Sequence, residues 1–237
     1  MNDATPLVVA NLKANKTWDE MSDWLDQISP FAEKFSGTVV VCPTSAFIAA
    51  AHQKLQTENS KLKLGSQDIS KFEHGAYTGE LAASQIADIC QYAIIGHSER
   101  KKFFGETPDD VLAKLKLALD AKVKPILCLA NIEELDYYLS KSPFLQEASS
   151  QICFVYEPPS AISAQGEYKP DDPEVAAKIA GSIKSKISPE AVVIYGGSIN
   201  SNNAAGFFSK ESIKGGLVGQ ASLDPSHFVR ILESISR

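Results

Sequence analysis

The feature that most constrains the fold is a series of short apolar runs, rich in β-branched residues, that alternate with longer stretches of helical period. Eight such runs occur, at residues 7–11, 38–42, 62–66, 92–96, 124–129, 151–156, 191–195 and 215–219. They are too uniformly apolar for strands with one face in water, so we expect parallel strands that are covered on both faces. Eight strand–helix units in 237 residues, without a linker, predict an α/β protein with a (β/α)8 barrel in a single domain spanning residues 1–237.

Helix signals fill the segments between these runs. One predicted stripe that faces the sheet consists of Val175, Ile179, Ile183 and Ile187, and another consists of Val111, Leu115 and Leu119. Thr107, Asp172 and Asp224 each precede a proline, a pair that is typical of an N-cap and the first helical residue. Thr17 with Glu20 fits a capping box. These signals predict helices of ordinary length between the strands.

Composition excludes several classes of protein and partner. The net charge is −6 and no basic run occurs, which argues against nucleic acid or an anionic membrane surface as a partner. No apolar stretch reaches 18 residues and the first residues lack a charged leader region, so we expect no membrane span, no signal peptide and a cytoplasmic location. No G-x-G-x-x-G follows a strand and no GK[ST] phosphate loop exists, so the doubly wound nucleotide-binding fold is the weaker alternative.

The four cysteines lie far apart, mostly inside apolar runs. They are Cys42, Cys90, Cys128 and Cys153, and no two have C-x-x-C spacing. This pattern favours reduced, buried thiols over a disulfide framework or a zinc site.

Polar residues follow several predicted strands at their carboxyl ends, which open on one face of a barrel, where active sites lie. They are Asn11, Lys13, His97, Glu99, Glu157, the segment YGGSIN at 195–200, Gly219 and Gln220. Each has a plain structural explanation on its own: a solvated charge, a satisfied histidine or a glycine turn. Glu157, for example, stands between Tyr156 and two prolines and fits a water-facing charge at a strand end. Their coincidence at matching strand ends favours one shared site.

Several segments together resemble a known family. They are NLK at 11–13, GAYTGE at 75–80, IIGHSER at 94–100, FFGET at 103–107, YEP at 156–158, YGGSIN at 195–200 and GLVGQASL at 216–223. In order and spacing they are similar to the signature segments of the triosephosphate isomerases, which are TIM barrels. The resemblance covers nearly the whole chain, and GHSER and YGGS with YEP between them are highly specific.

The resemblance implies the catalytic residues Lys13, His97 and Glu157. Glu157 would be the base that moves a proton between adjacent carbons of dihydroxyacetone phosphate and D-glyceraldehyde 3-phosphate, a reaction of glycolysis and gluconeogenesis. His97 would polarise the carbonyls as a neutral imidazole, and Lys13 would attract the phosphorylated substrate. A helix that starts at Ser98 would direct its positive end at His97 and so disfavour the imidazolium.

The resemblance also implies binding residues and a partner. Asn11 would orient the substrate with Lys13, and Glu99 would hold either Lys13 or the reacting hydroxyls. Phosphate would sit on backbone N–H groups near Ser198, Gly219 and Gln220, with another amide from a lid at Ser163. Thr78, at the tip of GAYTGE, would reach into a second subunit, so we expect a homodimer. No metal or organic cofactor is implied.

The chain departs from the family pattern in its lid and beside it. Ser160, Ser163 and Gln165 stand where a tryptophan and two glycines are usual, Asn131 stands where a glutamate is usual, and Gln220 stands where a glycine is usual. Gln220 is tolerable only if its φ angle is negative.

Ser160 and Asn131 stand for a tryptophan and a glutamate that meet in the family when the lid moves. We therefore expect a lid that closes without that latch and depends on Tyr195 and Ser198.

Three functions remain open at this stage. The first is an active isomerase. The second is a barrel that binds a phosphosugar without turnover, although binding alone does not require a base. The third is another phosphate-handling barrel isomerase, which should lack GHSER and YEP in this register.

Overall fold

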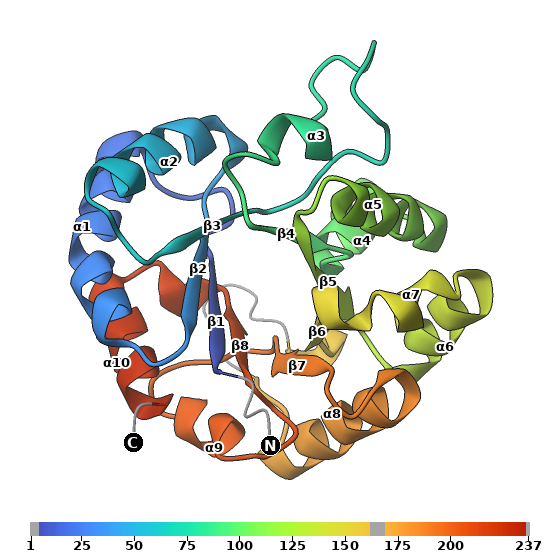
Figure 1. Ribbon diagram of the computed structural model, residues 1–237. Coiled ribbons are helices and arrows are strands. Elements are labelled where there is room, and N and C mark those ends of the chain that lie inside the picture. The colour runs from blue at the N-terminus through green and yellow to red at the C-terminus, as the bar shows by residue number, and fades with distance from the viewer. Residues whose placement is uncertain (1–4, 162–168, 236–237) are drawn as a thin grey trace.

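The structure, a computed structural model, describes residues 5–161 and 169–235, and within them eight parallel strands close into a barrel (Figure 1). The strands are β1 (Leu7–Asn11), β2 (Thr38–Cys42), β3 (Lys63–Ser66), β4 (Tyr92–Ile95), β5 (Lys124–Leu129), β6 (Cys153–Tyr156), β7 (Val192–Tyr195) and β8 (Gly215–Val218). Each strand pairs with the next in sequence, and β8 returns to pair with β1. The predicted (β/α)8 barrel is confirmed.

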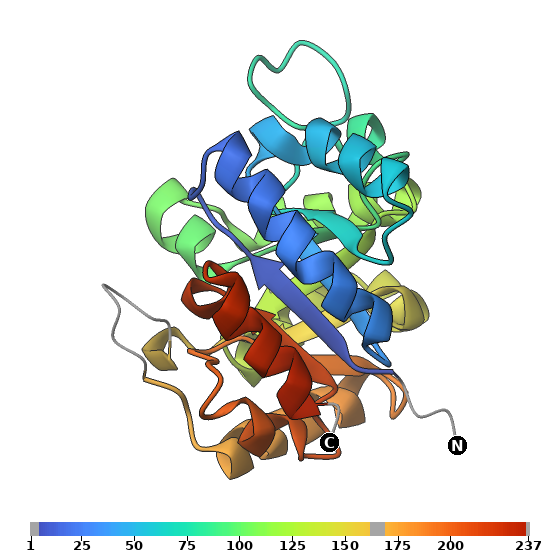
Figure 2. The same cartoon turned by 90° about the vertical axis from the view of Figure 1, so that its left-hand side faces the viewer.

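Helices surround this barrel on its outer side (Figures 1 and 2). The α-helices are α1 (Trp18–Lys34), α2 (Ile48–Thr57), α3 (Ala83–Ile86), α4 (Ser98–Phe104), α5 (Pro108–Asp120), α6 (Ile132–Lys141), α7 (Phe144–Glu147), α8 (Pro173–Ile187), α9 (Ala204–Phe208) and α10 (Pro225–Ile235). The 3₁₀ turns are η1 (Ser45–Phe47), η2 (Ser149–Gln151), η3 (Pro159–Ala161) and η4 (Gln220–Ser222). No helix among the described residues is long and apolar enough to cross a membrane.

The hydrophobic core has two layers, one on each face of the barrel. The inner layer contains Leu7, Val9, Val40, Cys42, Ile94, Ile126, Cys128, Cys153, Val155, Ile194 and Leu217. The outer layer packs the alternate strand residues, such as Val8 and Ala10, against the helices. Burial on both faces explains why the strands are apolar at nearly every position.

The predicted helix starts are confirmed. The side chains of Thr107, Asp172 and Asp224 each accept a hydrogen bond from a backbone N–H group in the first turn of the helix that follows. Thr17 and Glu20 form the predicted capping box of α1. These contacts satisfy backbone donors that have no partner inside the helix.

The predicted stripe of α8 is wrong at its first residue. Val175 is 51% exposed, whereas Ala176, Ala180 and Ile183 are buried. Small alanine side chains let the helix backbone approach the barrel closely, so the buried face of α8 is rotated from the face that the largest side chains suggested.

A buried group of charges ties α4 and α5 to the end of β3. Lys114 Nζ lies 2.7 Å from a carboxylate oxygen of Asp68 and also contacts Glu106. Arg100 Nε lies 2.6 Å from Asp68 and 3.0 Å from Glu106. Burial raises the pKa of Asp68 even though Lys114 opposes that shift. Removing one cation would leave part of the carboxylate charge unpaired, so the loss of Lys114 or Arg100 should destabilise the packing of the two helices.

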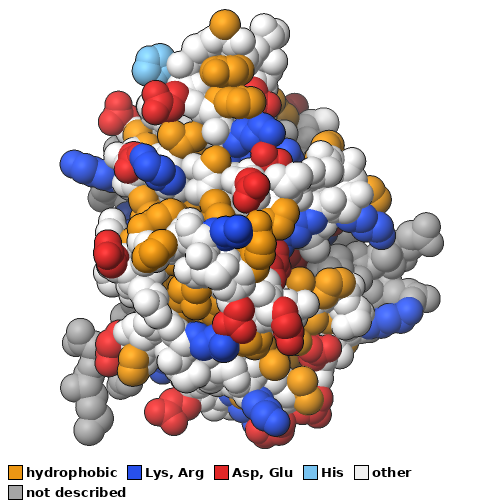
Figure 3. All heavy atoms as spheres, turned by 90° about the vertical axis from the view of Figure 1, so that its right-hand side faces the viewer, with side chains coloured by type: hydrophobic (Ala, Val, Ile, Leu, Met, Phe, Trp, Pro, Cys, Tyr) orange, Lys and Arg blue, Asp and Glu red, His pale blue; other side chains and the backbone are white. Residues whose placement is uncertain are grey.

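A long loop, residues 67–82, protrudes from the barrel between β3 and α3 (Figures 1 and 2). Its base is closed by a hydrogen bond from the Ser70 N–H group to the Leu81 carbonyl, and residues 71–80 are all exposed. The rings of Phe72 and Tyr77 stack with their centroids 4.3 Å apart. Figure 3 shows hydrophobic side chains gathered on this protruding end of the molecule.

Candidate active site

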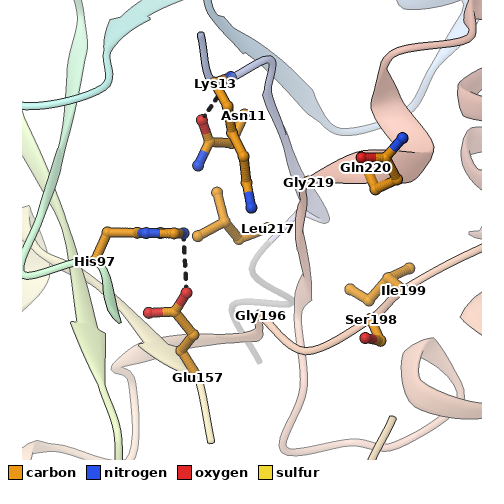
Figure 4. Close-up of a pocket in the computed structure, with 10 residues that line it drawn as sticks. All are labelled: Asn11, Lys13, His97, Glu157, Gly196, Ser198, Ile199, Leu217, Gly219 and Gln220. Atoms are coloured by element: carbon orange, nitrogen blue, oxygen red, sulfur yellow. Dashed lines mark hydrogen bonds and ion pairs between the residues drawn. The ribbon is translucent and has the colours of Figure 1, made fainter. Parts of the chain in front are cut away.

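One cavity opens at the carboxyl ends of the strands, where the sequence predicted a site (Figure 4). It is lined by Asn11, Lys13, His97, Glu157, Gly196, Ser198, Ile199, Leu217, Gly219 and Gln220. Seven predicted site residues are therefore brought together. An eighth, Glu99, is joined to the cavity through Lys13, whose Nζ atom lies 2.5 Å from a Glu99 carboxylate oxygen.

Glu157 follows β6 directly and is buried, with 2% of its surface exposed. His97 Nε2 lies 2.9 Å from Glu157 Oε1. Ser98 donates its N–H group to Glu157 Oε2 at 2.9 Å and its hydroxyl to Oε1 at 3.0 Å. The carboxylate therefore points inward onto the start of α4, and the plain alternative, a charge turned to water, does not hold.

His97 is the N-cap of α4, and its hydrogen bonds define one tautomer of the ring. Nδ1 accepts a hydrogen bond from the Glu99 N–H group at 3.2 Å, so Nδ1 carries no hydrogen. Nε2 then carries the ring hydrogen and donates it to Glu157. The helix predicted after His97 is present, and it presents its N-terminal N–H groups to the ring as expected.

Opposing influences act on the pKa of Glu157. Burial raises it, whereas His97 and the two Ser98 donors lower it, and the net direction is below the ordinary value of a glutamate. Donors that bind the charged form stabilise the carboxylate. These donors therefore favour the carboxylate form of Glu157, which is the form that can accept a proton.

Lys13 enters the cavity from a strained loop after β1. Its backbone lies in the left-handed region at a φ of 53°, and its N–H group donates to Asn11 Oδ1 at 3.2 Å. Gln67 donates its side-chain amide to the carbonyls of Lys13 and Cys42, each at 2.9 Å. In this structure Glu99 holds Lys13, which is one of the two roles left open for it.

Gln67 is a site residue that was not predicted from the sequence. Its position directly after β3, together with the other strand-end residues, was the available signal.

Ser198, Gly219 and Gln220 line the opposite side of the cavity from His97 (Figure 4). Gly219 precedes η4, the short turn that begins at Gln220. Gln220 is not among the described residues with positive φ, which satisfies the condition for replacing a glycine there. Ser198 instead has a φ of 47°.

The first glycine of YGGS is required by space. A Cβ atom at Gly196 would lie 2.6 Å from Val155 and 3.4 Å from the Cβ of Glu157. Gly196 therefore lets β7 end close beside the carboxylate. The expected reason, freedom in φ, does not apply, because Gly196 is not among the described glycines with positive φ.

Several predicted residues lie elsewhere. Ser163 and Gln165 fall outside the described residues, and Thr78 lies in the protruding loop. Ser160 is exposed, and no hydrogen bond between it and Asn131 is found in the described part of the chain. Asn131 caps α6 by accepting from the Glu134 N–H group at 2.9 Å. The closed-lid hypothesis that concerns Ser160 and Asn131 therefore stays a prediction.

Glu134 supplies a carboxylate beside the end of β5, one that the sequence analysis missed. It accepts hydrogen bonds from the Ala130 N–H group at 2.8 Å and the Tyr138 hydroxyl at 2.7 Å, and it pairs with Lys101 at 2.5 Å. It lies three residues after Asn131, in the first turn of α6. The turn of the helix places its carboxylate back at the end of the strand.

Tyr195 and Ser198, expected to hold the lid, each contact one end of the segment that follows Glu157. The Ser198 hydroxyl donates to the Ala161 carbonyl at 2.6 Å. The Tyr195 hydroxyl accepts from the Asp171 N–H group at 2.9 Å. Both contacts fall on the described flanks of residues 162–168, and the role in closure remains a prediction.

A closed parallel barrel with a carboxylate, an imidazole and an ammonium around one cavity at its carboxyl face defines a (β/α)8-barrel enzyme equipped for proton transfer. The sequence matches the family model described as Triosephosphate isomerase over residues 6–235. The chain belongs to the triosephosphate isomerase family and is an isomerase. The activity of this family interconverts dihydroxyacetone phosphate and D-glyceraldehyde 3-phosphate in glycolysis and gluconeogenesis.

Relatives support this assignment along the whole chain. The triosephosphate isomerase of Shewanella loihica is 31% identical, covering 95% of this chain and 95% of the relative. Those of Aquifex aeolicus and Mesomycoplasma hyopneumoniae are also 31% identical, with coverage of 96% and 95% of this chain and 98% of each relative.

Proposed function

We propose that Glu157, His97 and Lys13 carry the isomerisation of the triose phosphate in this chain. Glu157 takes a proton from the carbon next to the carbonyl, and the electron pair of the broken C–H bond forms a C=C bond as the carbonyl oxygen becomes an enediolate oxygen. A proton moves from the hydroxyl group of the first carbon to the enediolate oxygen on the neighbouring carbon. The protonated carboxyl group then returns its proton to that neighbouring carbon, and the first carbon becomes the new carbonyl. A positioned base of this kind contributes about 10²- to 10⁴-fold in rate.

His97 and Lys13 stabilise the charge that develops on the substrate oxygens. The Nε2 hydrogen of His97, which faces Glu157 in this structure, turns to the carbonyl oxygens when substrate is present. Lys13 supplies a fixed cation in a protein whose net charge is −6. Donors that face developing charge are worth more in a buried site than in water.

The phosphate group binds on the opposite side of the cavity. We assign it to backbone N–H groups near Ser198, Gly219 and Gln220, with Ser163 as a further amide donor. The turn η4, which begins directly after Gly219, supports this assignment. Backbone N–H groups at the N-terminus of a helical turn favour anions. Asn11 and Glu99 keep Lys13 in position.

The observation that carries the proposal is the meeting of three groups from distant parts of the chain. Glu157 lies 2.9 Å from His97 Nε2, and Lys13 extends into the same cavity (Figure 4). A barrel that only bound a phosphosugar would have no use for a buried, ionised base held against an imidazole.

A coupled assay on purified protein tests the proposal. The wild-type protein should turn over glyceraldehyde 3-phosphate, and Glu157→Ala should lose several orders of magnitude in kcat because the base is gone. Glu147→Ala, which removes a carboxylate from the short outer helix α7, is the matched control and should keep wild-type kcat. Equal activity of Glu157→Ala and wild type would remove Glu157 from the mechanism.

We also propose that the chain forms one catalytic domain over residues 1–237, acts as a homodimer and resides in the cytoplasm. The protruding loop with exposed Phe72 and Tyr77 supports a second subunit, as do the exposed Phe103 and Phe104 of α4. All four cysteines are free and buried, as predicted, which supports a reducing compartment. Burial raises the pKa of Cys90 to about 12, so its thiol is unreactive.

A further inference from the structure

Asp171 is held by two tyrosines at the ends of neighbouring strands. Its carboxylate oxygen Oδ2 accepts a hydrogen bond from the Tyr156 hydroxyl at 2.9 Å. Its backbone N–H group donates to the Tyr195 hydroxyl, also at 2.9 Å. Tyr156 is the last residue of β6 and Tyr195 the last residue of β7, so one residue bridges two adjacent strands of the barrel.

Both tyrosines are rigidly placed. Tyr195 is fully buried and stacks on Phe207 with centroids 4.1 Å apart. Tyr156 is 8% exposed, and its ring lies 6.1 Å from that of Tyr195. Burial, reinforced by the Asp171 carboxylate, raises the pKa of Tyr156, so its hydroxyl stays protonated and donates. Asp171 therefore meets a fixed donor and a fixed acceptor.

The position of Asp171 in the chain connects it to the base. Glu157 directly follows Tyr156, and its own N–H group is anchored to the Leu129 carbonyl at 2.8 Å. The next two residues are prolines, which have no N–H group and cannot donate to the barrel. Contacts that hold the described flanks of the segment after Glu157 include the hydrogen bond from Ser198 to Ala161 and the bridge at Asp171.

We propose that Asp171 is a positioning residue for the proton-transfer reaction, which acts through Tyr156 to fix the strand end that carries Glu157. The inference rests on the proposed role of Glu157 as the base. With the Tyr156 hydroxyl held by Asp171, the end of β6 has fewer arrangements, and Glu157, the next residue, keeps its place beside the cavity. Misplacement of a reacting group by about 1 Å can cost about 10²-fold in rate.

Steady-state kinetics of Asp171→Ala, Asp171→Asn and Tyr156→Phe test the proposal. We expect Asp171→Ala to lower kcat by about 10- to 100-fold, with a smaller change in KM, because the phosphate contacts are untouched. Tyr156→Phe should match that loss, and the double variant should be no worse than either, since both remove the same hydrogen bond. Asp171→Asn should recover most of the activity, because its side-chain oxygen still accepts from Tyr156.

The pH profile separates positioning from a purely structural role. His97 and Ser98 lower the pKa of Glu157 through contacts that require its present geometry. Loosening that geometry should move the acid limb of kcat/KM to higher pH in Asp171→Ala and Tyr156→Phe, but not in Asp171→Asn. A variant that was merely less stable would unfold at a lower midpoint temperature, but its acid limb of kcat/KM would stay in place.

Two matched controls make the same chemical changes away from the bridge. Asp172→Ala removes the adjacent carboxylate, which caps α8, and Tyr137→Phe removes a hydroxyl that contacts Asp109 on the surface. Both should keep wild-type kcat and pH profile. Wild-type kinetics in Asp171→Ala, or additive losses in the double variant, would overturn the inference. An inactive wild type, or a fully active Glu157→Ala, would instead overturn the proposed function.

Discussion

Ser98 directly follows His97 and donates both its N–H group and its hydroxyl to Glu157. In Ser98→Ala only the hydroxyl is lost, so the pKa of Glu157 should rise, since one of the groups that lowers it is gone. The acid limb of kcat/KM should therefore move to higher pH. We also expect kcat to fall about three- to tenfold, because the carboxylate is held less firmly.

Kinetics from pH 4 to 9 would measure this effect. Ser98→Thr keeps a hydroxyl at the same position and serves as the control, with an unchanged acid limb. An acid limb that stays in place in Ser98→Ala would mean that the hydroxyl bond does not persist in solution.

Site residues that directly follow a strand could be predicted from the sequence. Lys13, His97 and Glu157 follow separate strands, and a closed barrel brings such positions together. Gln67 and Asp171 were not predicted as site residues, because their roles depend on backbone carbonyls and hydroxyls contributed by distant segments. Periodicity and spacing carry no information on which distant hydroxyl an aspartate will meet.

Individual elements show the same division between local and long-range causes. The strands were found because double-sided burial leaves a local apolar run, and the helix starts were found because caps are local contacts. The start of β6 was placed at 151 rather than Cys153, since the 3₁₀ turn η2 takes up residues up to Gln151. The stripe of α8 was misjudged at Val175 because the distance of a helix from its sheet is a tertiary property.

Overpacking tests the corrected face of α8. Ala180 is 1% exposed, so Ala180→Leu has no room for its larger side chain and should lower the free energy of unfolding by about 1–3 kcal/mol. Val175→Ala, on the exposed face, should change it by no more than about 0.5 kcal/mol. Urea unfolding of both variants measures the difference. Equal changes in the free energy of unfolding for the two variants would support the buried face that was predicted from the sequence.

The architecture of the whole molecule was predicted from eight strand–helix units without a linker, a pattern that fits a closed barrel better than an open doubly wound sheet. The protruding loop is different, since burial within the described part of the chain does not account for it. Residues 71–80 are all exposed, and Phe72 and Tyr77 stack on each other out in solvent. An exposed aromatic pair on an extended loop is a liability unless a second subunit covers it.

Thr78→Arg tests the assembly at this loop. A chain of 25.6 kDa should elute as a dimer of about twice that mass in light-scattering chromatography, whereas an arginine at the tip should shift it towards the monomer by burying a charge in the interface. We expect isomerase activity to fall together with the dimer fraction and to recover partly at high protein concentration, because association follows mass action.

Val175→Arg provides the matched control for that experiment, since Val175 is exposed on α8, at the end of the molecule opposite the loop (Figure 1). It adds the same charge at an exposed apolar position and should leave both mass and activity unchanged. A monomeric wild type with full activity would contradict the proposed homodimer. A dimer that persists in Thr78→Arg would move the interface away from the loop, towards surfaces such as the exposed aromatic pair of α4.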